Sequence, residues 1–419
     1  MAEERFEFNS RLKKRLIVFG VAGLVLVAIG IILLLTGGGH HAEGQEAATA
    51  GAHDEFHWYQ RLYANLWINN VYFTGIALIG VFFVAVNYVA HAGWSAVIKR
   101  VPEAFGAWLP FAGGLMLVVF LIANHDLFHW THDYLYDETD PRYDELIAGK
   151  RGYLNIPFYL IRMVLYFGIW YFMYWLIRKE SLNEDLEGGT QHYYKSVKLS
   201  AIFLVIFAVT SSTSAWDWIL SIDTHWFSTM IGWYVFASWF VTGLAAITLT
   251  VILLRENGYL KLVTSEHLHD LGKFIFAFSI FWTYIWFSQF MLIYYANIPE
   301  ETIYFVERLA RDQYAPVFFI NLILNFFFPF LVLMTRDSKR HTVFLKLVCV
   351  IVLIGHWLDF YLMVTPGTLS ENGGFGFMEI GLALVYGAAF VFVILTSMSK
   401  ASLVAVNHPM LGESTHHHT

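Results

Sequence analysis

The run LIVFGVAGLVLVAIGIILLLT, residues 16–36, has 21 residues and no charged side chain. A helix needs about 20 apolar residues to cross the hydrocarbon core of a bilayer. Because the run follows the cationic segment RLKKR, it could also be a secretory signal, cleaved after ATAGA, residues 48–52. The apolar core of a signal is usually shorter, about 7–15 residues. The run therefore predicts a membrane-spanning helix, with removal of the segment as the alternative.

The remainder of the chain has the same apolar character. Of its 419 residues 57% are hydrophobic and 14% are charged, whereas a soluble domain is about 25% charged. Backbone groups cannot stay unpaired in lipid, so each further apolar stretch is expected to be a helix. The predicted fold class is all-α, a polytopic integral membrane protein with about ten transmembrane helices. The other nine spans are predicted near residues 67–90, 106–124, 153–177, 199–215, 229–254, 271–295, 314–335, 343–364 and 377–400.

Lys and Arg are distributed unevenly between the alternate connections of these spans. With the N-terminus inside, the inner segments hold 19 of the 26 Lys and Arg residues and the outer connections hold 6. The remaining one, Arg162, lies within the fourth span. This distribution follows the positive-inside rule and predicts cytoplasmic N- and C-termini. The segment Gly37–Ala52 is expected to be a flexible outer linker.

Several classes of function lack their sequence features. A single cysteine, Cys349, leaves no internal disulfide, no Cys-ligated iron–sulfur cluster and no C-x-x-C-H haem attachment. The segment HDLFHWTHD spaces His125, His129 and His132 as metal ligands can be spaced, but a helix is expected to end there, so no metal is predicted. No basic patch or Gly-rich phosphate loop favours nucleic acid or nucleotides. The chain is thus predicted to bind no redox cofactor by its own ligands.

Polar side chains inside the spans are the candidate functional residues. A central Arg or Asp costs roughly 2.5–3.5 kcal/mol on insertion scales, so such residues need a reason. With the predicted orientation they gather in the outer half of the membrane or at its outer edge. The inner half has little comparable beyond Lys273, Lys346 and His91. The outer candidates are His125, Asp126, Arg162, Asp217, Asp223, His225, Gln289, Asn297, His356, Asp359 and Glu379, with Asn321 and Asn325 at the same level.

Each candidate has a structural and a functional interpretation. Arg162 lies too deep to reach water and needs an acidic partner, in an ion pair or in a site. His356 and Asp359 are three residues apart on one helix face and form either a satisfied core pair or a site. Glu379 is either interfacial or functional. His125 and Asp126 are expected to reach the same cavity at a helix end.

This residue set suits three functions. A quinone pocket needs an apolar slot with a His or an acid that exchanges a proton. A proton path needs carboxylates, His and hydroxyls in series, and the run TSSTSAWD, residues 210–217, supplies hydroxyls. The third interpretation is a purely structural scaffold.

Two long segments resemble a known family. They are SAWDWILSIDTHWFSTMIGWY, residues 214–234, and HLHDLGKFIFAFSIFWTYIWFSQFMLIYYANIPEET, residues 267–302. Both are similar to the NrfD/PsrC-like membrane subunits of bacterial alternative complex III, a quinol:acceptor oxidoreductase, and most similar to the ActF-type subunits. The resemblance implies two four-helix bundles flanked by two peripheral helices. The corresponding regions are 1–65, 66–228, 229–376 and 377–419.

The resemblance also implies partners. They are an ActC-like paralogue, an iron–sulfur subunit, and multihaem and monohaem cytochrome c subunits, with a terminal oxidase as a further candidate, in the bacterial cytoplasmic membrane with its lipids. Electrons would leave through cofactors of those partners. An ActF-type chain would offer a menaquinone-type cavity or part of a proton path, since the working quinol site is placed in the paralogue. The two segments match the family at Asp217, Asp223, His225, Gln289 and Asn297.

Residues 214–234 are predicted to form a rigid outer cap over the cavity between the helices. Their four Trp side chains would lie at the level of the lipid head groups. Asp217, Asp223 and His225 would face the cavity mouth or a partner. The alternative is a solvated turn in which Asp223 or Ser228 caps a helix.

Overall fold

The computed structural model describes residues 4–37 and 56–418. Within these ranges ten helices are long and apolar enough to cross a membrane, which confirms the predicted fold class and number of spans. Nearly all of the predicted linker, and the ATAGA segment, lie outside the described residues. The spans are α1 (Ser10–Gly37), α2 (Trp58–Val89), α3 with α4 (Arg100–Phe105 and Leu109–Leu127), α6 (Ile156–Glu187), α7 (Gln191–Ala215), α8 (Ile231–Glu256), α9 (Ser265–Ala296), α11 with α12 (Ala315–Leu322 and Phe328–Val332), α13 (Thr342–Leu369) and α14 (Phe377–Met398).

Several helices extend beyond the apolar stretches that predict them. Helix α2 begins at Trp58, α6 continues to Glu187 and α9 begins at Ser265. The side chain of Thr264 accepts a hydrogen bond from the backbone of Glu266, and that of Asn155 accepts one from Phe158. Such caps let polar turns continue a helix past the bilayer. Hydropathy alone marks only the part of a helix that lies in lipid.

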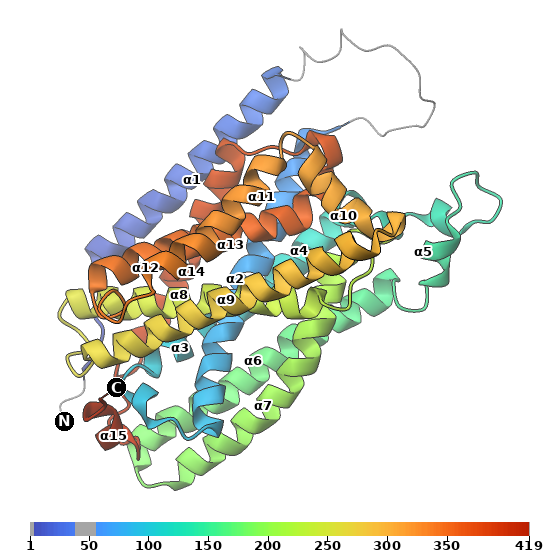
Figure 1. Ribbon diagram of the computed structural model, residues 1–419. Helices are drawn as coiled ribbons and strands as arrows, with labels where there is room; N and C mark the ends of the chain where they lie inside the picture. The colour runs from blue at the N-terminus through green and yellow to red at the C-terminus, as the bar shows by residue number, and fades with distance from the viewer. Residues whose placement is uncertain (1–3, 38–55, 419) are drawn as a thin grey trace.

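The helices form two bundles that share a central contact. Helices α2, α4, α6 and α7 pack together as the first bundle, and α8, α9, α11–α12 and α13 as the second. Helix α2 also packs on α8 and α13, so α2 and α8 are the most deeply buried spans. Figure 1 shows the two bundles side by side. The arrangement has the two four-helix bundles that the family resemblance implies.

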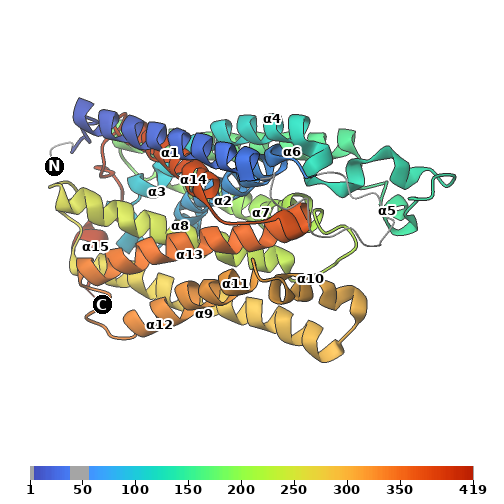
Figure 2. The same ribbon diagram turned by 90° about the horizontal axis from the view of Figure 1, so that it is seen from above.

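Helices α1 and α14 lie outside the bundles as a pair (Figure 2). Their backbones approach closely at Gly23 and Gly381, because a Cβ atom on Gly23 would lie 2.7 Å from the carbonyl oxygen of Gly381. Only glycine leaves room for two helices to pack at this distance.

Both described ends of the chain lie at the same end of the molecule, called the inner end because the charge count assigns it to the cytoplasm. There the backbone N–H of Leu403 donates to the carbonyl oxygen of Glu4 at 2.8 Å. A 3-10 turn, Gly93–Val97, and the short helix α15 (Leu411–Thr415) pack together at the same end. The opposite, outer end carries α5 (Glu145–Gly149), α10 (Pro299–Ala310) and 3-10 turns at His129–Thr131, Asp133–Tyr136 and Ser370–Asn372 (Figures 1 and 2).

Two π-helical turns interrupt the spans, one in each bundle. Trp216–Leu220 ends α7, and Ile323–Phe327 separates α11 from α12. A π-turn rotates the side chains that follow it and often occurs at functional sites. Asp217 lies in the first π-turn and Asn325 in the second, so each π-turn supplies one residue of a buried polar cluster.

Candidate functional site

The second bundle surrounds Asp359 of α13 with neutral donors. The Tyr234 hydroxyl donates to one carboxylate oxygen, and Asn321 Nδ2 donates to the same oxygen at 3.0 Å. Ser238 Oγ and Trp282 Nε1 donate to the other oxygen at 2.7 and 3.0 Å. Asp359 is fully buried and forms no ion pair with a described Lys or Arg. Four donors match an ionised carboxylate, which only accepts.

His356 lies one turn deeper on the same helix. Its ring is fully buried, and neither ring nitrogen has a hydrogen-bond partner among the described residues. Its Nδ1 is 3.7 Å from Asp359 Oδ2, too far for a hydrogen bond. Trp282 meets the His356 ring edge to face at 5.3 Å. The sequence interpretation of His356 and Asp359 as a satisfied pair is therefore wrong, since only Asp359 is satisfied.

A second polar atom near His356 also lacks a partner. Asn325 Nδ2 donates to Asn321 Oδ1 at 2.6 Å, whereas Asn325 Oδ1 is buried and accepts from no described group. Asn325 lies against Gly355, where a Cβ atom would come within 2.2 Å of its Oδ1. Because residue 355 is glycine, the Asn325 amide can lie directly against the α13 backbone. Most buried polar groups are paired, so the unpaired His356 ring beside the unpaired Asn325 oxygen makes this cluster the candidate site.

Two cavities lie between this cluster and the outer end. The inner one is lined by Tyr234, Trp286, Gln289, Tyr304, Phe305, Arg308, Phe318, Leu362 and Met363. The outer one is lined by Phe227, Ser228, Thr229, Met230, Gln289, Leu292, Ile293 and Glu301. Gln289, one of the predicted candidates, is buried and borders both cavities. Tyr234 borders the inner cavity and also donates to Asp359, so its side chain lies between that cavity and the carboxylate.

Helix α10 and the loop before α8 close the outer end of these cavities. Trp226 stacks on Tyr304 at 3.9 Å between ring centroids and donates from Nε1 to the carbonyl oxygen of Glu301. Arg308 Nη2 donates to Asp223 Oδ2 at 3.3 Å, and its Nε donates to the carbonyl oxygen of Leu362. Burial raises the pKa of the Asp223 carboxyl, and the positive charge of Arg308 offsets part of this rise. The predicted cap is present, but Asp223 binds α10 and does not cap a helix.

The Trp side chains of the cap are only partly interfacial. Trp216 and Trp233 are 40% and 60% exposed, as expected for lipid-facing residues. Trp218 and Trp226 are buried within the protein. The expectation that all four lie at the head groups is therefore wrong. The Met230 N–H donates to Ser228 Oγ at 3.3 Å. This contact lies within the turn that the alternative interpretation predicts at Ser228.

In the first bundle Asp217 is the acid that Arg162 requires. Arg162 donates from Nε and Nη2 to the two carboxylate oxygens at 2.7 and 2.9 Å. Tyr166 donates to Asp217 Oδ2 at 3.1 Å, and the guanidinium lies over the Tyr153 ring. Both charges are buried and fully paired. This is the ion pair of the structural interpretation, and neither residue lines either of the two outer cavities.

Glu379 is neither interfacial nor free. It is fully buried and accepts from Arg61 Nε and Nη2 at 2.6 and 2.7 Å. Asn65 Nδ2 and the backbone N–H of Gly376 donate to it at 2.9 and 2.7 Å. The pairing joins α14 to α2 and gives the carboxylate a fixed cationic partner, which supports a structural interpretation of Glu379.

Four further candidates lie at the outer surface. His125 contacts the Thr131 hydroxyl while Asp126 accepts from Gln60, so they do not reach a common cavity, because adjacent helix residues point in different directions. His225 contacts Asp144 at 2.5 Å and is half exposed. Asn297 has a φ of 48° and ends α9 in the left-handed conformation. The His125–His132 and His129–His132 rings approach to 5.1 and 5.7 Å, but no group of three metal-ligating side chains forms among the described residues.

The inner end contains a buried charged network that the sequence interpretation missed. Lys99 Nζ contacts Glu184 at 3.0 Å and the Tyr88 hydroxyl at 2.7 Å. Glu103 accepts from Arg178 and Arg100 at 2.6 and 3.1 Å. The expected concentration of buried charge in the outer half is therefore wrong. These residues were assigned to inner loops, because the predicted spans began at 106 and ended at 177.

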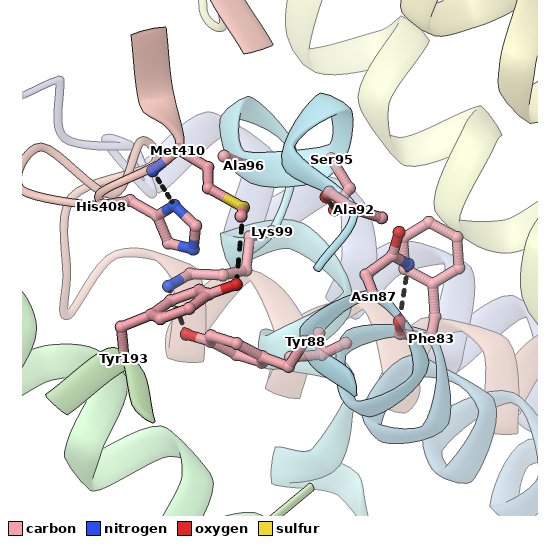
Figure 3. Close-up of a pocket in the computed structure, with 11 residues that line it drawn as sticks. Phe83, Asn87, Tyr88, Ala92, Ser95, Ala96, Lys99, Tyr193, His408 and Met410 are labelled. Carbon is pink, nitrogen blue, oxygen red and sulfur yellow. Dashed lines mark hydrogen bonds between the residues drawn. The ribbon is translucent and has the colours of Figure 1, made fainter. Parts of the chain in front are cut away.

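The C-terminal segment closes a small cavity over this network. Figure 3 shows Lys99, Tyr88, Tyr193 and His408 pointing toward one another, with Met410 above them. Burial and the neighbouring Lys99 charge lower the pKa of His408 to about 3. The side chain of Ser414 donates to the carbonyl oxygen of Trp94 at 2.6 Å and fixes the segment.

The sequence interpretation also missed four residues that define the outer site. They are Tyr234, Ser238, Trp282 and Arg308. Tyr234, Ser238 and Thr242 recur at every fourth position of α8 and so share one helix face, which is a signal the sequence contains. The charge count assigns Arg308 only to an outer loop, and nothing in the local sequence predicts its contacts with Asp223 and the α13 backbone.

The fold and the site define a polytopic α-helical membrane protein with a buried carboxylate–histidine centre near its outer end. Comparison with protein-family models gives no match, and comparison with curated proteins gives no significant match. The family resemblance therefore stays a prediction.

Proposed function

We propose that the chain is a membrane subunit of a respiratory quinol:acceptor oxidoreductase of the alternative complex III type, in the bacterial cytoplasmic membrane. Its second bundle would contribute part of a proton path on the outer side of the membrane. The observation that supports this most directly is the buried His356 ring, which has no hydrogen-bond partner among the described residues and lies 3.7 Å from the Asp359 carboxylate.

The argument for proton exchange is electrostatic. An ionised carboxylate in a dry interior is costly unless a positive charge compensates it. The donors around Asp359 are neutral, and the nearest basic group is His356. One proton held by either residue would neutralise the pair, and a small movement of either side chain would close the 3.7 Å gap. His and carboxylate groups inside a membrane commonly serve as proton relays.

The route to the outer side would use the two cavities. A proton leaving Asp359 meets the Tyr234 hydroxyl, which borders the inner cavity, and then the Gln289 amide, which borders both. The inner cavity has room for about one water molecule. A water molecule with two to four polar partners can transfer a proton, whereas a quinone ring does not fit in this space. The size of the inner cavity therefore favours a proton path over a quinol site next to Tyr234.

The remaining parts of the proposal come from the resemblance. An ActC-like paralogue would oxidise the quinol, and an iron–sulfur subunit with multihaem and monohaem cytochromes c would accept the electrons. A terminal oxidase is a further candidate partner. The alternative function is a structural subunit, in which Asp359 only fixes the contact between α13, α8 and α9.

Proton release by the purified assembly in proteoliposomes tests the proposal. Asp359→Asn and His356→Phe are each expected to lower quinol-driven proton release about 100-fold, the usual scale for loss of a positioned acid or base. Asp126→Asn is the matched control, because that carboxylate lies at the outer end and binds Gln60 of the first bundle. Normal proton release by both variants in a fully assembled complex would favour the structural alternative.

A further inference from the structure

The inner end of α1 presents a cationic groove that the proposed function does not use. Arg11, Lys14 and Arg15 are exposed and line the groove together with Ser10. Val18 and Phe19 complete it on the membrane side and are 65% and 57% exposed. The groove therefore has a positively charged half and an apolar half, one above the other along the same helix.

No described carboxylate compensates the charges of this groove. None of the three cations forms an ion pair with a carboxylate of residues 4–37 or 56–418. Elsewhere at the inner end Lys99 pairs with Glu184, and Lys346 pairs with Glu256 at 2.8 Å. An anion from outside the chain would therefore meet cations that have no described ionic partner.

The cations lie at the start of α1, where the helix dipole adds to their positive potential. Helix α1 begins at Ser10, after Asn9, whose Oδ1 accepts from the backbone of Leu12 at 2.9 Å. The first turn of a helix is its positive end, where Lys and Arg side chains are unfavourable and anions are stabilised. Four cations lie within the first six residues of α1, namely Arg11, Lys13, Lys14 and Arg15, and they reinforce a positive potential that already exists.

The apolar half of the groove faces the space that lipid occupies. Helix α1 packs mainly on α14 through one face, which the close approach of Gly23 and Gly381 fixes. Its other face exposes Ile17, Val18 and Val21 by half or more. A ligand that matches both halves has an anionic head and a hydrocarbon chain.

We propose that the inner end of α1 binds one anionic phospholipid, whose head-group phosphate contacts Arg11, Lys14 and Arg15 and whose acyl chain lies along Val18 and Phe19. A basic side chain near an anionic head group strengthens binding about 5-fold, so three give about 100-fold. The site lies outside both bundles and is independent of Asp359. Binding of this lipid fixes the depth of α1 in the membrane.

Native mass spectrometry of the delipidated chain, titrated with dioleoyl-phosphatidylglycerol or dioleoyl-phosphatidylcholine, tests the site. The wild type is expected to bind one phosphatidylglycerol molecule about 100-fold more tightly than phosphatidylcholine. Arg11→Gln/Lys14→Gln/Arg15→Gln is expected to remove this preference. The matched control, Lys179→Gln/Lys195→Gln/Lys198→Gln, removes three exposed cations from the inner ends of α6 and α7 and is expected to keep it.

Two further measurements make the result decisive. Arg11→Lys/Arg15→Lys retains the charges and is expected to retain the preference, which separates lost binding from misplaced α1. Inorganic phosphate at the same concentration is expected not to compete; full competition would show a phosphate site without lipid specificity and overturn the proposal. An equal loss in the control variant would also overturn it, because the effect would then follow net charge and not the groove.

Discussion

Each bundle buries an acid on or at the end of its fourth helix, and the surroundings of the two acids differ in charge. Asp217 lies at the end of the fourth helix of the first bundle, and Asp359 lies on the fourth helix of the second. Arg162 holds Asp217 in a bidentate ion pair. Asp359 has four neutral donors and a histidine that does not reach it. The first acid has a fixed counter-charge, whereas no Lys or Arg of the described residues compensates the second.

This difference separates stability from function. A buried, bidentate ion pair is costly to break, because the remaining charge is left without its partner. Asp359 has its hydrogen bonds but no compensating Lys or Arg among the described residues, and the imidazole beside it lacks a hydrogen-bond partner there. Natural proteins retain such strain mainly at functional sites. The first cluster therefore supports the fold, and the second is the better candidate for proton exchange.

The largest expected effect is on the first cluster. Asp217→Asn leaves the Arg162 guanidinium buried without its counter-charge, and we expect a loss of about 3–5 kcal/mol in the free energy of unfolding. Unfolding of the purified protein by titration with sodium dodecyl sulfate measures it. The double variant Arg162→Leu/Asp217→Leu is expected to recover most of the loss. A single variant as stable as the wild type would remove the contrast between the bundles.

The matched change in the second bundle is expected to cost less. Asp359→Asn keeps the volume of the side chain. Its amide NH₂ group, however, has to face one of the donors that surround Asp359, such as Trp282 or Ser238. One lost and unsatisfied hydrogen bond costs about 1–3 kcal/mol. The same detergent titration applies. A loss equal to that of Asp217→Asn would mean that Asp359 has a permanent cationic partner.

Replacing His356 is expected to change stability least within the clusters. His356→Phe retains an aromatic ring and breaks no hydrogen bond to a described residue. The free energy of unfolding is therefore expected to stay within about 1 kcal/mol of the wild type. Together with the loss of proton release proposed above, this would identify a functional residue. Strong destabilisation would instead indicate a buried water or another structural partner of the ring.

The smallest expected effect is a pH dependence of the melting temperature, which the buried His408 at the inner end produces. Because the pKa of His408 is lowered to about 3, the unfolded chain binds more protons than the folded one between pH 3 and the ordinary His value near 6.5. Stability is then lost as the pH falls through this range. Between pH 7.5 and 5.5 the melting temperature of the wild type is expected to fall by roughly 1–2 °C more than that of His408→Gln. Equal slopes for the two proteins would show that His408 is accessible to protons when folded.

The site was predicted in part, and the residues show why. His356, Asp359, Gln289, Asn321 and Asn325 were recognisable, because a polar side chain inside an apolar run is conspicuous whatever its neighbours are. Their partners were not recognisable. Tyr234, Ser238 and Trp282 are ordinary in a membrane helix, and only packing of α8 and α9 against α13 aims them at one carboxylate.

Charged residues near the ends of the spans were misplaced for a related reason. Lys99, Glu103 and Glu184 were assigned to loops, since hydropathy falls at a charge whether or not the helix continues. In the structure the helices continue, and the charges meet across α3 and α6. Arg162 was expected to need an acid, and Asp217 was itself a candidate, but no sequence spacing links residues 55 positions apart.

The sequence by itself determined the class of protein, the ten helices and the charge difference between the two ends, because these follow from transfer free energies that each residue contributes independently. Only the tertiary structure decided which buried charges are paired, which histidine lacks a partner, and which side chains border a cavity. Those properties depend on distances of a few ångströms between helices that are far apart in the chain, and such distances follow from packing, not from composition.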